Sequence, residues 1–278
     1  RLQGLLSGDL DVIFSMGPDD RPIIEGEGHM VFVRATPGVI VMPFNLTVNS
    51  PLRDVRVRRA LNHAVDNASI IKVILGEEAI VPKQFTPHMA FGYDPEYAPY
   101  PFDLPRARAL MAEAGHARGF DLSVEVAQGL SSYSSSIYQL IAAHLSKIGV
   151  RMEIRPVPIA RYMSILMQGQ WNGTMGINLD YAVDPSMDAL VPIDRHSCIG
   201  AIPWYCDPAI VPLLAAARST TDLDERLALT KRVVRRQTEQ APGLLLWEKI
   251  RYDAVSKQVR GFDHDLNFIH YNELTFER

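Results

Sequence analysis

The segment between Asp54 and Gly76 constrains the fold most, because its apolar residues recur at the spacing of an α-helix. Asp54 can accept the free N–H groups of a first helical turn, and Gly76 is a natural stop. The apolar positions fall at i, i+3, i+4 and i+7 and so share one face: Leu61, Ala64, Val65 and Ala68. The segment predicts one amphipathic helix with a solvated polar face, made of Arg58, Arg59, Asn62 and Asp66.

Composition is that of an ordinary globular protein without a nucleic-acid partner. Hydrophobic residues make up 47% and charged residues 22% of the 278 residues, a length that allows one large domain or two ordinary ones. The net charge of −4 lacks the basic balance of a nucleic-acid binder. No apolar run reaches the ~18 to 20 residues of a membrane span. The first residues lack an initiator Met and the pattern of a signal peptide, so we expect the sequence to begin within a longer protein.

Strands and helices alternate along the chain. This order predicts an α/β fold with an at least partly parallel sheet. Strands are expected at 10–14, 30–33, 40–48, 122–126, 150–155, 174–179, 244–247 and 252–262. Helices are expected at 54–75, 106–114, 137–148, 160–167, 208–217 and 222–240.

Catalytic and cofactor motifs are missing from the sequence. It has no G-x-S-x-G elbow, H-E-x-x-H pair, P-loop or G-x-G-x-x-G fingerprint. Gly26-Glu27-Gly28 fits a tight turn better than a phosphate cradle, and the eight His residues are scattered. We therefore expect neither an enzyme nor a bound cofactor.

The stretch after the expected strand at 174–179 is the strongest candidate for a ligand site. Ligands of α/β sheets sit outside the carboxyl ends of strands. Asp180 could pair there with a cationic group, and Tyr181 could supply an aromatic wall. Asp180 and Asp184 could instead be turn and cap residues. For Asp184, which precedes Pro185, we prefer the cap; for Asp180 the pattern leaves both interpretations open.

Cys198 and Cys206 are the two cysteines of the chain. Their short spacing, with Gly and Pro between them, could close a small disulfide loop in an oxidising compartment. Two unrelated buried thiols fit the spacing equally well. A metal site is disfavoured, because His196 alone does not complete a tetrahedral set.

Several stretches resemble, in order along the chain, the bacterial extracellular solute-binding proteins of family 5, the peptide- and nickel-binding components of ABC importers. The signature-like segment is D-V-R-V-R-R-A-L-N-H-A-V-D at 54–66. The other matching stretches are L-L-S-G-D-L-D-V-I at 5–13, Phe44-Asn45, L-M-A-E-A-G at 110–115, L-S-K-I-G-V at 145–150, and 207–226.

The resemblance implies a periplasmic-binding-protein-like fold of type II, mainly its second lobe with strands that belong to the first. Family members are about twice this long, so the N-terminal part of lobe one, with the export signal, would be missing here. The expected division is a lobe-one segment and hinge crossover at 1–45, the ligand-binding lobe at 46–240, and a return to lobe one at 241–278.

The resemblance also implies site residues. An Asp in the family's peptide binders holds the ligand's α-ammonium, and the matching position is Asp180. The small disulfide of that subgroup matches Cys198 and Cys206. Two positions depart from the pattern, because Gln128 stands where dipeptide binders use an Arg for the ligand carboxylate, and Asn178 and Leu179 stand where a Trp often occurs. The expected ligand contacts are Gln128, Tyr133, Asn178, Leu179, Asp180, Tyr181 and Trp204.

The function implied is that of the substrate-binding component of an ABC importer. It would capture a peptide or peptide-like solute between two lobes and deliver it to permease subunits in the membrane, in the periplasm or lipid-anchored outside the cell. The alternatives are a nickel- or haem-type solute binder and the ligand-sensing domain of a transcription regulator.

Overall fold

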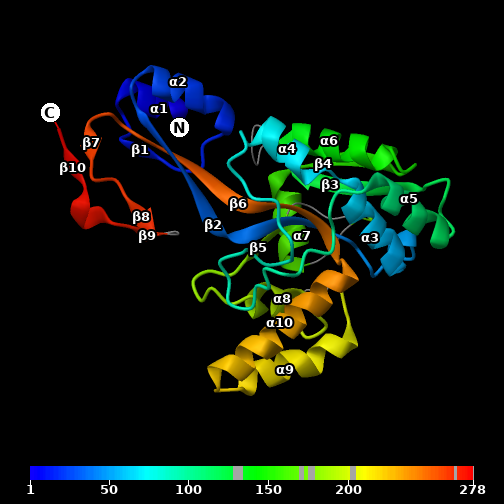
Figure 1. Cartoon of the computed structure of the whole chain (residues 1–278). Coiled ribbons are helices and arrows are strands. Elements are labelled where there is room, and N and C mark those ends of the chain that lie inside the picture. The colour runs from blue at the N-terminus through cyan, green and yellow to red at the C-terminus, as the bar shows by residue number, and fades with distance from the viewer. Residues whose placement is uncertain (128–133, 169–171, 175–178, 201–204, 266–267, 278) are drawn as a thin grey trace.

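Two long antiparallel strands connect the two main parts of the molecule. The computed structural model describes residues 1–127, 134–168, 172–174, 179–200, 205–265 and 268–277. In it β2 (Met30–Pro43) and β6 (Gly243–Val255) run side by side from the part that holds both termini into the helical part (Figure 1). β1 (Val12–Ile13) pairs with the far end of β6, and β5 (Leu179–Ala182) pairs with β2, which gives the order β1-β6-β2-β5.

β2 differs from the sequence expectation of two separate strands at 30–33 and 40–48. One continuous strand forms because Pro43 falls at its last position, where a missing N–H costs little. The register jumps between the pairs Ala35↔Ile250 and Val39↔Glu248, so three residues of β2 face Lys249 alone. The bulge keeps both strands in one sheet while changing their direction.

A parallel pair, β3 (Asp121–Ala127) and β4 (Arg151–Val157), forms the sheet of the second part. It confirms the expected parallel pairing. Thr174 is hydrogen-bonded to this pair and to the chain after β2: its N–H donates to the Ser123 carbonyl at 3.1 Å, and its own carbonyl accepts from the Asn45 N–H at 3.0 Å. The segment around Thr174 therefore joins the parallel pair to the end of β2.

Helices pack on the parallel pair around the largest apolar core. These are α3 (Val55–Ala64), α4 (Asn67–Ile74), α5 (Leu104–Glu113) and α6 (Ser134–Ser146). α7 (Ile159–Gln168) contacts β3. A separate apolar cluster joins α8 (Leu190–His196), α9 (Val211–Ser219) and α10 (Leu223–Gln240). The short elements near the termini are α1 (Leu2–Ser7), α2 (Arg21–Gly26), β7 (Val259–Arg260), β8 (His264–Asp265), β9 (Phe268–Ile269) and β10 (Thr275–Phe276).

The segment at 54–76 is two helices rather than one. α3 ends at Ala64, and Asp66 caps α4 by accepting the Ser69 N–H at 3.0 Å. The single-helix expectation was wrong because Asp66 can cap a new helix as readily as it can occupy a polar face. Asp54 caps α3 as expected, by accepting the Arg56 N–H at 2.8 Å.

Arg58 corrects the expectation of a solvated polar face on this segment. Its side chain is only 3% exposed and its guanidinium donates to the carbonyls of Leu52, Gln240 and Ala241 at 2.8 to 3.1 Å. The carbonyls at the end of α10 lack helical partners, and a buried cation there satisfies them. Burial lowers the pKa of Arg58 from its ordinary value.

The predicted division of the chain at residues 45 and 240 stays a prediction. Separate apolar clusters surround the terminal elements, and Leu5 and Tyr252 belong to one of them. The strand segment Leu244–Trp247 is buried in the cores of the described part. No helix in the described ranges is long and apolar enough to cross a membrane.

Candidate functional site

Asp180 lies at the junction of the two parts, in β5 rather than in a loop. In the pairing of β5 with β2, Asp180 lies opposite Ile40, Tyr181 opposite Val39, and Ala182 opposite Gly38. Successive side chains of a strand point to opposite faces of a sheet, so Asp180 and Tyr181 face opposite ways. The strand pairing therefore places the Asp180 carboxylate above Gly38 and close to the bulge of β2.

The two oxygens of the Asp180 carboxylate have different surroundings. Oδ2 accepts a hydrogen bond from the Lys249 ammonium of β6 at 2.5 Å. Oδ1 is buried and has no hydrogen-bond partner among the residues that the structure describes. A Cβ atom at Gly38 would lie 2.2 Å from Oδ1, so only glycine leaves room for the carboxylate there. The site thus holds a carboxylate with one paired and one unsatisfied oxygen.

Electrostatics at Asp180 combine opposing effects. Burial raises the pKa of Asp180 above its ordinary value, the Lys249 ammonium counteracts this, and the nearby Asp184 carboxylate adds to the rise. Burial also raises the pKa of Tyr162 at the start of α7, with a further contribution from the Asp180 charge. Tyr162 is thus a neighbour of Asp180.

Tyr181, expected as an aromatic wall, packs into a core instead. It is 1% exposed, and its ring lies edge-on to Phe85 with ring centroids 5.9 Å apart. His196 is also a ring neighbour of Tyr181, at 5.4 Å between centroids. A role for Tyr181 in ligand contact stays a prediction, and the packing gives the residue a structural task.

The remaining expected contacts are largely outside the described residues. Gln128, Tyr133, Asn178 and Trp204 all fall there. Leu179 is described as the first residue of β5, paired with Val41, but its side chain is not. Asp180 is therefore the expected ligand contact for which the structure gives a polar environment.

Asp184 lies in a turn, joined to Pro185 by a cis peptide bond. No helix starts at this position, since α8 begins at Leu190, so the expectation of a helix cap was wrong. The turn follows β5 directly, which explains why the Asp184 charge reaches Asp180.

The disulfide between Cys198 and Cys206 is confirmed. Their Cα atoms are 4.5 Å apart and the sulfur atoms are bonded. The pair follows α8 and precedes the turn into α9, so it ties together the two ends of the connection between these helices. Of the two interpretations that the spacing left open, the disulfide is correct.

A comparison with family models matches residues 1–191 to the bacterial extracellular solute-binding proteins, family 5, in their middle region. The chain belongs to this family.

Individual family 5 proteins resemble the chain over nearly its whole length. The di/tripeptide-binding protein 2 of Pseudomonas aeruginosa is 25% identical over 271 residues, which cover 94% of this chain and 50% of that protein. Heme-binding protein A of Haemophilus influenzae is 28% identical over 236 residues, covering 81% and 42% respectively. The chain thus spans about half the length of the curated relatives it matches.

Solved structures show the shared fold. An ABC transporter-associated periplasmic binding protein from Helicobacter pylori, in complex with the peptide STSA, matches with a TM-score of 0.84 at 21% identity. The match covers 100% of this chain and 55% of that chain. The expected periplasmic-binding-protein-like α/β fold is therefore confirmed.

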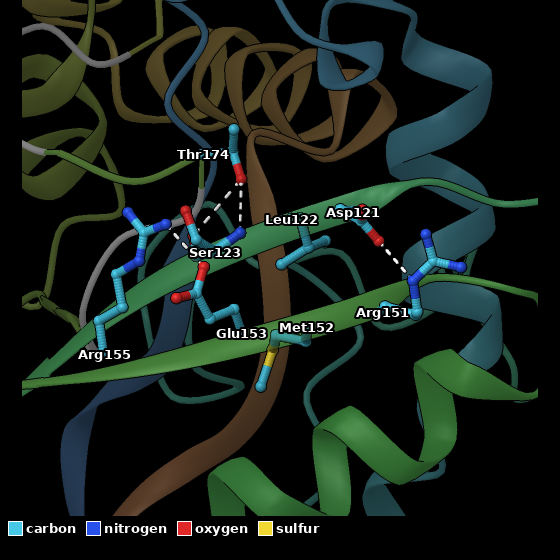
Figure 2. A pocket seen from close by; sticks show the side chains of 8 residues that line it. All are labelled: Asp121, Leu122, Ser123, Arg151, Met152, Glu153, Arg155 and Thr174. Atoms are coloured by element: carbon cyan, nitrogen blue, oxygen red, sulfur yellow. Dashed lines mark hydrogen bonds and ion pairs between the residues drawn. The ribbon is translucent and has the colours of Figure 1, made fainter.

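A surface hollow lies elsewhere on this family 5 chain. It has a volume of about 530 Å³ and is lined by residues of β3 and β4 with Thr174 (Figure 2). Its charges are already paired, Arg151 with Asp121 and Arg155 with Glu153, both at 2.6 Å. The lining comes from the first residues of both parallel strands, whereas ligands of such sheets bind beyond the carboxyl ends. We therefore place the site at Asp180 and not in this hollow.

Sequence reasoning missed Lys249, Gly38 and Tyr162 as neighbours of Asp180. Tyr162 could have been found, because α7 follows β4 and so starts at the carboxyl edge of the parallel pair. Lys249 and Gly38 carry no such local signal, since they reach Asp180 only through the pairing of β2 with β5 and β6. No group of three or more His, Cys, Asp or Glu side chains within the described ranges is arranged to hold a metal.

Proposed function

We propose that this chain forms the greater part of the ligand-binding lobe of an ABC importer's substrate-binding component. The ligand would be a peptide or peptide-like solute with a free amino group. The observation that carries the proposal is the Asp180 carboxylate, which lies where β5 pairs with β2. Its Oδ1 atom has no hydrogen-bond partner among the described residues. Membership of family 5 supplies the class of function.

The amine is the ligand group that fits this carboxylate best. An N-terminal ammonium has three N–H donors, and a charged donor on a carboxylate gives a strong, directional hydrogen bond. A partly desolvated site strengthens this interaction relative to water. Gln128 stands where dipeptide binders of the family use an Arg for the ligand carboxylate, so the proposal does not require a free carboxylate at the ligand's other end.

Binding would be coupled to closure of two lobes. β2 and β6 are the paired connections between the terminal part and the helical part, so a change in their direction at the bulge would move one part relative to the other. A ligand that contacts both lobes would favour the closed arrangement through its higher affinity for it. The other lobe would come from the N-terminal half found in the longer family members.

The proposed setting is the periplasm or the outer face of a membrane, with permease subunits of the importer as partners and no catalytic step. The disulfide between Cys198 and Cys206 suits an oxidising compartment. A nickel- or haem-type ligand is less well supported, because its metal would need a donor set that the described residues do not form. A regulator's sensing domain has no specific observation in its favour.

The test is identification of the ligand followed by titration. The two-lobed protein is purified under native conditions, and ligand released on denaturation is identified by mass spectrometry; we expect a compound with a primary amine. Asp180→Asn keeps the shape but removes the charge, and losing one partner of a desolvated charged pair costs about 2 to 5 kcal/mol. Calorimetry should therefore show at least about a tenfold loss of affinity.

Asp184→Asn is the matched control, since it removes a neighbouring carboxylate that lies in the turn after β5. Its effect on affinity should be small. Equal effects of the two substitutions, or a released ligand without an amine, would refute the role of Asp180.

A further inference from the structure

We propose that Lys249 is a built-in competitor for the ligand's amine. In the ligand-free protein its own ammonium occupies Asp180, and the ligand binds by displacing it. This proposal rests on the proposed function, because it takes Asp180 as the acceptor of the ligand's amine.

The competing group has the same chemistry as the ligand group. Lys249 donates from a primary ammonium to Asp180 Oδ2 at 2.5 Å, and a peptide's N-terminus would present the same kind of cation. The Lys249 ammonium already compensates the Asp180 charge when the ligand arrives. Because two ammonium groups on one carboxylate repel each other, binding becomes an exchange of one ammonium for another.

Lys249 satisfies only part of the carboxylate. Oδ1 of Asp180 is buried and has no hydrogen-bond partner among the described residues, and it lies so close to Gly38 that a Cβ atom there would be 2.2 Å from it. A buried acceptor without a donor is unfavourable. A ligand ammonium that donates to Oδ1 as well as to Oδ2 would satisfy the acceptor that the Lys249 ammonium leaves without a donor, which gives the ligand an advantage over the lysine.

The position of Lys249 in the chain allows the exchange. Its side chain is 41% exposed, so the ammonium can move into solvent without crossing a packed core. Its backbone lies opposite the bulge of β2, where the Thr36 hydroxyl donates to the Lys249 carbonyl at 3.3 Å. The strand therefore stays in place while the flexible side chain leaves.

The test compares variants of the two-lobed protein by calorimetric titration with L-alanyl-L-alanine at pH 7.5. Lys249→Met keeps the length of the side chain and removes the ammonium. If Lys249 blocks the carboxylate for about 90% of the time, its removal raises the affinity about tenfold. Lys249→Gln should give a smaller gain, because its neutral amide still donates, and Lys249→Arg should give none, because it keeps the charge.

Two controls separate competition from other effects. Lys72→Met removes a lysine that pairs with Glu77 at 3.0 Å on an exposed surface of α4, and it should leave affinity unchanged. In the Asp180→Asn background, Lys249→Met should no longer increase affinity, because the group for which lysine competes is gone. Thermal melts of each variant verify that it is folded.

A pH profile supplies a second measurement. The charged and titratable groups around Asp180 are Lys249 of β6, Asp184 after β5 and Tyr162 of α7. Without Lys249 the partly buried carboxyl group takes up a proton more readily, so dipeptide binding by Lys249→Met should weaken more steeply than wild-type binding as pH falls from 7.5 to 5.

The outcomes distinguish the two proposals. Lower or unchanged affinity of Lys249→Met, together with a loss of affinity in Asp180→Asn, would overturn the competitor and leave the proposed function standing. Equal binding by wild type and Asp180→Asn, or no binding of the dipeptide by any variant, would overturn both.

Discussion

Two opposing effects act on the pKa of the Asp180 carboxylate. Burial favours its neutral form, and the Lys249 ammonium favours the charged form. Neither contribution can be read from the residues next to Asp180, because Lys249 is 69 positions away in the sequence. At the scale of single residues, the chemistry of the site depends on which strands are paired.

Burial also lowers the pKa of a second side chain, His196. It is 7% exposed and packs on Tyr181, and burial lowers its pKa from the ordinary 6.5 to about 3. As pH falls below about 6.5, the unfolded chain binds a proton that the folded chain refuses, so stability decreases. Between pH 6.5 and 4.5 this group alone should reduce the free energy of unfolding by about 2 to 3 kcal/mol.

His196→Gln tests this expectation, because the amide does not titrate in this range. Urea unfolding at pH 6.5, 5.5 and 4.5 should show a shallower loss of stability in the variant than in the wild type. Parallel pH profiles of the two proteins would mean that His196 is protonated in the folded state.

At the scale of elements, α3 anchors the strand that crosses between the two parts. The Asn62 side chain donates to the Gly243 carbonyl at 2.9 Å and accepts the Leu245 N–H at 3.0 Å. Asn67, at the start of α4, donates to the Leu245 carbonyl at 2.8 Å. The signature-like segment at 54–66 thus serves the structure by fixing the start of β6.

Asn62→Ala should destabilise the protein markedly. It leaves a carbonyl and an N–H of β6 without partners in a buried position, at a cost of roughly 2 to 4 kcal/mol. Asn67→Ala removes one bond in a partly buried position and should cost less. Denaturant unfolding of both variants measures the order, and an equal or reversed order would contradict the anchoring role of Asn62.

At the scale of the whole molecule, the terminal elements lie at one end of the crossing strands and the helical part lies at the other (Figure 1). Apolar side chains near both termini are exposed, among them Leu10, Ile23, Tyr271 and Phe276. This surface fits contact with the rest of a first lobe, as the proposed two-lobed arrangement requires.

The chain expressed by itself should therefore bind a hydrophobic dye and self-associate, because contiguous exposed apolar surface promotes association. Dye fluorescence and sedimentation velocity measure the two effects, with the two-lobed protein as the control that should show less of each. A monomer without dye binding would argue that the terminal part needs no further covering. The buried Leu244–Trp247 strand should contribute nothing to either signal.

The sequence alone determined what depends on near neighbours. Asp54 caps its helix as predicted, since a cap needs only a carboxylate two or three positions before a free N–H. The alternation of strands and helices also predicted the parallel pair with α5 and α6, whereas α3 and α4 were expected as one helix. The order of matching stretches indicated the family, because spacing along a chain is itself a property of sequence.

Tertiary structure alone decided which distant groups meet. Arg58 was expected on a solvated face, but the end of α10 packs against it, and β6 brings Lys249 to the Asp180 carboxylate. The Tyr181 side chain points into a core because of the register in which β5 pairs with β2. A shift of that register by one residue would place it on the other face of the sheet. Periodicity gives each strand two faces, but only the pairing of strands selects which face meets the core and which charges lie within hydrogen-bonding distance.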